Sequence, residues 1–318
     1  MKNINRIFLF GDSWIEGQGT YSEVIDNIYH PLKEPSLPYG EGKGTIREWR
    51  KNNSWGKFFV DKYGINPNQI INYGCQGQSN YHSLYELNKV LQKVQPTDLI
   101  LFGFTSKFRD SNCLHFAYQN QFPMHHNSPA MGAYLTHEKQ QLLYPKEGDI
   151  FPDFRNGNVD GLSEYEMKFA EEWIVDYITS VFDESVYENI AQANFLFYQK
   201  WCKENNVNIL FFDLFESYID KRYVKKYYEV DESIYINYGQ KNYFQRLVDY
   251  ERENYTKDSN YTIWEHGGAM KFPCGDSGYE MKPGHSIYHP NQHGYKVMFD
   301  DITNNHVDIN FKINVDTN

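Results

Sequence analysis

The chain has 318 residues, 40% of them hydrophobic, which is enough for one large α/β domain or two small ones. Its formal net charge is −11, from 31 basic and 42 acidic residues. Because binding to a nucleic-acid backbone requires clustered Lys and Arg, this balance argues against nucleic acid as the main partner. No apolar stretch reaches the roughly 20 residues that cross a bilayer, so we expect no membrane span.

The N-terminal segment MKNINRIFLF has too short an apolar run for a signal peptide and lacks a small-residue cleavage site. The four cysteines form no C-x-x-C pair and lie far apart, at Cys75, Cys113, Cys202 and Cys274. These features favour reduced thiols and a cytoplasmic protein, although a protein carried in a virion or released by lysis would share them.

Four short apolar runs are typical of buried strands, because they lack the strict alternation of a half-exposed strand. They lie at residues 7–10, 70–73, 99–104 and 208–215. Helical patterns occupy residues 53–64, 79–94 and 163–204 (with a break near 183–185), and residues 289–302 are predicted to be a loop that enters a final helix. Strands that alternate with helices predict an α/β fold with a mostly parallel sheet covered on both faces.

The whole chain, residues 1–318, is interpreted as one such domain with large loop or helical insertions. Three regions do not fit the alternation, at about 18–52, 111–160 and 216–284. Loops this long in a compact domain are usually either functional or mobile. Residues 223–245 are rich in tyrosine, and these rings are either core residues with their hydroxyls in solvent or a platform for sugar rings.

Small and polar residues follow three of the predicted strands. Ser13 follows the first in the sequence FGDSW, and Gly77 follows the second in NYGCQGQSN. Thr105 and Ser106 follow the third in GFTS. Ligands of an open parallel sheet bind outside the carboxyl ends of its strands, so we expect these loops to share one edge.

These segments, together with HPNQHGY near the C-terminus, resemble the sequence blocks of the SGNH, or GDSL-type, hydrolases. The resemblance is carried in the family's order by residues 6–17, 70–82, 98–109 and 287–299, and about 110–284 has no counterpart. It implies a flavodoxin-like three-layer α/β/α fold. It also implies that Ser13 is the nucleophile, that His289 is the catalytic base, and that Gly77 is an oxyanion-hole glycine.

The implied chemistry is ester hydrolysis through an acyl-enzyme. A serine hydroxyl becomes a good nucleophile when a base such as His289 takes its proton. The backbone N–H groups of Ser13 and Gly77 would stabilise the oxyanion. No metal and no other cofactor is needed. By family analogy alone, the substrate is a small-molecule or carbohydrate ester, with acetyl or another small acyl group.

The third block departs from the usual family pattern. Thr105 stands where the family has an oxyanion-hole Asn, so its hydroxyl is the candidate donor, and Ser106 replaces an Asp. The stretch GFTSKFR resembles a Gly-Trp-Thr-Ser-x-x-Arg variant of phage-encoded members. Under that reading Arg109 faces the site, and otherwise it is a surface charge.

The last block departs further, because Ser286 stands where the family carries the Asp that orients the histidine. Asp276 or Glu280, or a backbone carbonyl, could take over this task. Alternatively, the protein has lost most of its activity. The domain would then be a binding or structural module, for example virion-associated or glycan-binding.

Two residue patterns also have purely structural interpretations. Asp12 or Ser13 could simply cap a helix in a turn. His285, His289 and His293 have the i, i+4 spacing of a metal site, but Pro290 would break a helix running through them, so we expect no metal. Pro290 and Asn291 form a natural helix start, with Asn291 as the cap.

Overall fold

The computed structural model describes residues 1–17, 22–25, 28–31, 43–75, 80–105, 184–214, 217–219, 229–254, 263 and 289–315, and all structural statements concern these residues. For 22–25, 28–31 and 184–188 only the backbone is described. No helix in these ranges is long and apolar enough to cross a membrane.

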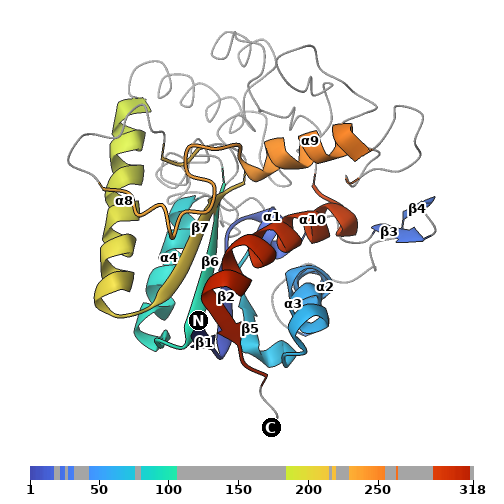
Figure 1. Cartoon of the computed structure of the whole chain (residues 1–318), viewed down its shortest axis with the longest axis horizontal. Helices are drawn as coiled ribbons and strands as arrows, with labels where there is room; N and C mark the ends of the chain where they lie inside the picture. Colours follow the sequence, from blue (N-terminus) through green and yellow to red (C-terminus); the bar gives the residue numbers. More distant parts are fainter. Residues whose placement is uncertain are drawn as a thin grey trace, which may run out of the picture.

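The centre of the molecule is a four-stranded parallel sheet in the order β5-β2-β6-β7 (Figure 1). Its strands are β2 (Arg6–Phe10), β5 (Ile70–Asn72), β6 (Asp98–Phe104) and β7 (Asn208–Asp213). Each corresponds to one of the four predicted strands, and the prediction of an α/β fold with a parallel sheet is confirmed.

Helices pack on both faces of this sheet, because neighbouring residues of each strand point to opposite faces. On one face, Leu9 and Leu101 belong to a core cluster with α3 (Trp55–Tyr63), α9 (Tyr243–Asn254) and α10 (Gln292–Ile302). On the other face, Phe10 and Phe102 belong to a second cluster with α4 (Asn80–Val90) and α8 (Glu184–Glu204). Figure 1 shows α4 and α8 on one side of the strands and α3 and α10 on the other.

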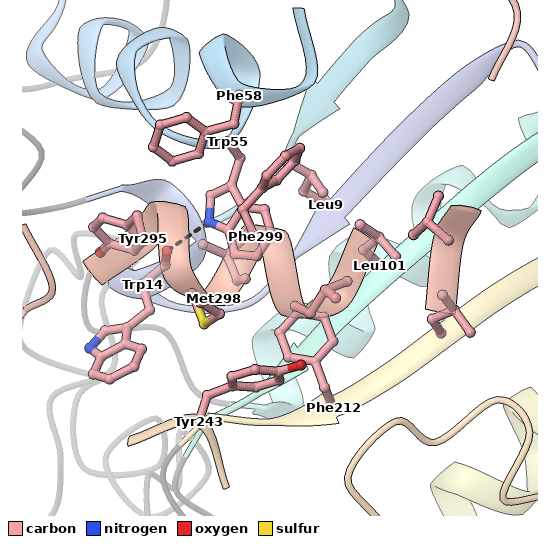
Figure 2. Close-up of a cluster of buried hydrophobic side chains, with 14 of the residues drawn as sticks. Leu9, Trp14, Trp55, Phe58, Leu101, Phe212, Tyr243, Tyr295, Met298 and Phe299 are labelled. Carbon is pink, nitrogen blue, oxygen red and sulfur yellow. Dashed lines mark hydrogen bonds between the residues drawn. The ribbon is translucent and has the colours of Figure 1, made fainter. Parts of the chain in front are cut away.

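The first cluster ties the short helix α1 (Ser13–Glu16) to the rest of the core. Figure 2 shows Trp55, Phe58 and Phe299 packed together, with the Trp55 indole Nε1 donating to the Trp14 carbonyl at 3.0 Å. The Phe299 ring lies edge-on to Trp55, with ring centroids 6.2 Å apart. Packing of α3 and α10 therefore also fixes the backbone that follows Ser13.

The region 18–52 contains regular structure that the sequence pattern did not predict. It holds a hairpin of β3 (Ser22–Ile25) and β4 (Ile28–Pro31), and the helix α2 (Ile46–Asn53). Helix α2 buries Arg47 and Arg50 beside Ile46, so charged residues occupy positions where an apolar stripe would mark a helix. The sequence pattern also did not predict a separate two-stranded parallel sheet, formed by β1 (Lys2–Ile4) and β8 (Phe311–Ile313).

The predicted helices 53–64, 79–94 and 289–302 correspond to α3, α4 and α10, and 184–204 of the predicted 163–204 is α8. Short helical turns complete these segments, at η1 (Pro67–Gln69), η2 (Leu91–Lys93), η5 (Thr303–Val307) and α11 (Asp308–Asn310). Residues 111–160 lie outside the described residues.

The described tyrosines of the segment 223–245 include core residues, as one of the two interpretations predicted. Tyr235 and Tyr243 are buried. Their hydroxyls are not in solvent, however: that of Tyr235 donates to Asp213, and that of Tyr243 donates to Asp301. Burial and these carboxylates raise the pKa of both phenols well above the ordinary value of 10. The prediction of solvated hydroxyls is therefore wrong for these two residues.

Candidate active site

Ser13 and His289 lie side by side, although 276 residues separate them in the chain. His289 Nε2 is 3.0 Å from Ser13 Oγ, which is hydrogen-bond distance. Both residues are buried, with 3% of Ser13 and 7% of His289 exposed. Ser13 begins α1 directly after β2, and therefore lies at the carboxyl edge of the sheet. This arrangement matches the geometry that a serine nucleophile and its base require.

Asp12 caps α1, so Ser13 itself does not have to. The Asp12 Oδ1 atom accepts a hydrogen bond from Trp14 N at 2.9 Å, which is the usual N-cap interaction. Capping and catalysis were alternative interpretations of this turn. The structure assigns the cap to Asp12, and the Ser13 hydroxyl faces His289.

The Thr105 hydroxyl donates to Asp12 Oδ2 at 2.7 Å, and both residues are fully buried. A hydroxyl has a single proton, and a carboxylate can only accept, so this proton is directed at Asp12. The oxyanion role of the Thr105 side chain therefore stays a prediction that this conformation does not favour. Instead, the bond joins the turn that carries Ser13 to the end of β6.

Asn80 holds the main chain of Thr105 in place. Asn80 Nδ2 donates to Thr105 O at 2.9 Å, and Thr105 N donates to Asn80 Oδ1 at 2.8 Å. This reciprocal pair links the first residue of α4 to the end of β6. Because the pair is buried, each group would be costly to leave without its partner.

The helix after His289 begins as predicted. Asn291 is the N-cap of α10, and its Oδ1 accepts from Gly294 N at 3.0 Å. One turn later, the buried Tyr295 directs its hydroxyl to Ser13 O at 3.5 Å. His289 and Tyr295, at the start of α10, thus both contact Ser13.

A buried charged cluster lies behind Ser13. Glu16, the last residue of α1, is fully buried and accepts from Arg47 Nε at 3.2 Å and from Arg50 Nη1 at 2.9 Å. Arg47 Nη2 also donates to Gly74 O, at 3.2 Å. A buried carboxylate is tolerated only when such partners satisfy it.

Of the predicted site residues, the structure brings together Ser13, His289, Asp12 and Thr105. The remaining ones lie outside the described residues, namely Gly77, Ser106, Arg109, Asp276, Glu280 and Ser286. Among the residues that are described, the Ser13 N–H donates to no acceptor, as an oxyanion donor would require.

The described part of the chain contains no group of three or more His, Cys, Asp or Glu side chains that could hold a metal ion. His293 lies within α10, and its Nε2 is 3.5 Å from the Tyr250 hydroxyl. The pKa of His293 is lowered below its ordinary value, first because the ring is buried and second because the positive charge of Lys296 is nearby. His285 lies outside the described residues.

Two cavities lie away from Ser13 and His289. The larger, of about 850 Å³, lies beside η1 and the start of β6. The other, of about 690 Å³, lies beside α2, α3 and β5, and its described lining includes neither Ser13 nor His289. Both basic and acidic side chains line it, among them Lys43, Glu48 and Asp61. The candidate site is placed at Ser13 and His289 instead, because there a hydroxyl lies within hydrogen-bond reach of an imidazole.

Comparison with known proteins adds no relative, since no family model, curated protein or solved structure matches this chain. The site therefore stands on its own geometry.

Sequence reasoning missed Asn80, Glu16, Arg47 and Arg50. The one local signal was the place of Asn80 at the start of a predicted helix.

Proposed function

We propose that this protein is a serine ester hydrolase that acts through an acyl-enzyme. The observation that carries the proposal is the 3.0 Å approach of His289 Nε2 to Ser13 Oγ, made by buried residues from opposite ends of the chain. If Ser13 were an ordinary turn residue and His289 an ordinary residue at a helix start, nothing would require this contact.

The sheet supports the finer assignment to an SGNH-type, flavodoxin-like α/β/α fold. In chain order, the strands of the central sheet follow the spatial order 2-1-3-4, which is that of the first four strands of the flavodoxin-like order 2-1-3-4-5. In such sheets, ligands bind where the direction of chain progression reverses, between the first strand and the third. Ser13 follows the first of these strands, and Thr105 follows the third.

In the proposed reaction, His289 Nε2 takes the proton of Ser13 Oγ as the hydroxyl attacks the ester carbonyl. The Ser13 N–H stabilises the oxyanion of the tetrahedral intermediate. His289 then gives the proton to the leaving alcohol, and a water molecule hydrolyses the acyl-enzyme by the same steps. The proposed substrate is an acetyl or other small acyl ester, such as that of a carbohydrate.

The test is steady-state hydrolysis of p-nitrophenyl acetate and of an acetylated monosaccharide. We expect Ser13→Ala and His289→Gln each to abolish most of the turnover, because the two residues act as a unit. Far-UV circular dichroism of each variant checks the fold. Hydrolysis by the wild type no faster than by Ser13→Ala would remove the proposal and favour a binding or structural module.

A further inference from the structure

The turn that carries Ser13 is held from behind by one arginine that also holds a neighbouring strand end. Ser13 and Glu16 are the first and last residues of the single-turn helix α1. Arg47 and Arg50 lie three positions apart on α2, so both reach the Glu16 carboxylate from the same side. Arg47 differs from Arg50 because it also donates to Gly74 O.

Gly74 lies in close contact with the backbone of α1. A Cβ atom at this position would lie 2.4 Å from Glu16 N and 2.6 Å from Ile15 C, so the two backbones meet without a side chain between them. Asn72 adds a second link, with its Nδ2 donating to Ile15 O at 2.7 Å and its Oδ1 accepting from Gly74 N at 2.8 Å. The end of β5 is therefore tied to the nucleophile turn.

We propose that Arg47 is a positioning residue for Ser13. Its guanidinium spans the Glu16 carboxylate and the Gly74 carbonyl with two different nitrogens, and so sets the separation between the nucleophile turn and the strand end. In the proposed acyl transfer, the hydroxyl and the N–H of Ser13 act only when the turn that carries them is correctly placed. The inference rests on the proposed esterase function.

Arg50 provides a matched control. Each arginine carries one positive charge beside Glu16, so Arg47→Met and Arg50→Met change the charge of the cluster equally. Both variants should lose thermal stability, but only Arg47→Met breaks the link to Gly74. We expect kcat for p-nitrophenyl acetate to fall about 100-fold in Arg47→Met with KM unchanged, the effect of misplacing a reacting group by about 1 Å. Arg50→Met should retain most of its kcat.

Two further variants test the same positioning role if Arg47→Met does not fold. Arg47→Lys retains the positive charge, but one ammonium group cannot replace two nitrogens of a planar fork, so we expect kcat to stay low. Gly74→Ala leaves the charges untouched and forces the two backbones apart, so kcat should again fall with KM unchanged.

The outcomes separate this inference from the proposed function. Equal kcat losses in the two Met variants, or wild-type kcat in Arg47→Lys, would overturn the positioning role while the esterase proposal stands. A wild-type protein that neither hydrolyses the ester nor reacts at Ser13 would overturn both.

Discussion

Replacing Asp12 by Ala should destabilise the protein markedly, because two separate hydrogen bonds end on this buried carboxylate. The variant removes the α1 cap to Trp14 N and leaves the fully buried Thr105 hydroxyl without its acceptor. Loss of a cap costs about 1 kcal/mol, and a buried donor without a partner costs about 1–3 kcal/mol. Together, these terms predict a decrease of about 2–4 kcal/mol in the free energy of unfolding.

The measurement is urea unfolding followed by far-UV circular dichroism with linear extrapolation. Asp12→Asn is the matched control: its amide oxygen can still cap α1, and its NH₂ group can donate to a rotated Thr105 hydroxyl. It should cost about 1 kcal/mol or less.

A double-mutant cycle with Thr105→Val isolates the bond itself. Bonds to charged groups contribute about 1.5–3 kcal/mol, so the coupling energy should lie in that range. A coupling energy within about 0.5 kcal/mol of zero would refute the assignment of the Thr105 proton to Asp12.

Three further predictions concern a backbone contact, pH and a thiol. Gly17→Ala should destabilise the protein more than Gly64→Ala. Both positions have positive φ, but a Cβ at Gly17 would lie 2.1 Å from a serine hydroxyl, whereas a Cβ at Gly64 would have nothing within 4 Å. Equal urea midpoints for the two variants would contradict this prediction. Burial lowers the pKa of His293 and His306 below 6.5, so below that pH the unfolded chain binds more protons and the free energy of unfolding falls as the pH drops. A His293→Gln, His306→Gln double variant should flatten that dependence, and an unchanged slope would count against it. Burial raises the pKa of Cys202 to about 12, so its tryptic peptide should remain free of iodoacetamide at pH 8 and be modified only in urea; rapid native modification would show that the thiol is accessible.

The strands β2, β6 and β7 of the central sheet were predictable because nearly all of their residues are buried, on both faces. The run 99–104 is buried throughout, so it is a continuous apolar run without alternation, which the sequence alone displays. Helix α2 was not predictable in the same way. Its buried face includes Arg47 and Arg50, which are tolerated there because partners such as Glu16 lie opposite.

The candidate site shows the same division. The sequence motif around Ser13 and the HPN segment at His289 single out two residues that the fold brings within 3.0 Å of each other. The bond from Thr105 to Asp12 could not be predicted, because it depends on which side chains meet beyond the ends of the neighbouring strands β2 and β6. Asn80 was likewise missed, since its amide binds main-chain atoms that no motif specifies.

The most direct test of the account is the site of reaction with a serine-reactive fluorophosphonate, mapped by mass spectrometry of the digested protein. If His289 activates Ser13, we expect one adduct, on the peptide that contains Ser13. We expect no label in Ser13→Ala and slow labelling in His289→Gln. A wild-type protein in which Ser13 stays unlabelled, or a His289→Gln variant that reacts as fast as the wild type, would contradict the claim that His289 activates Ser13.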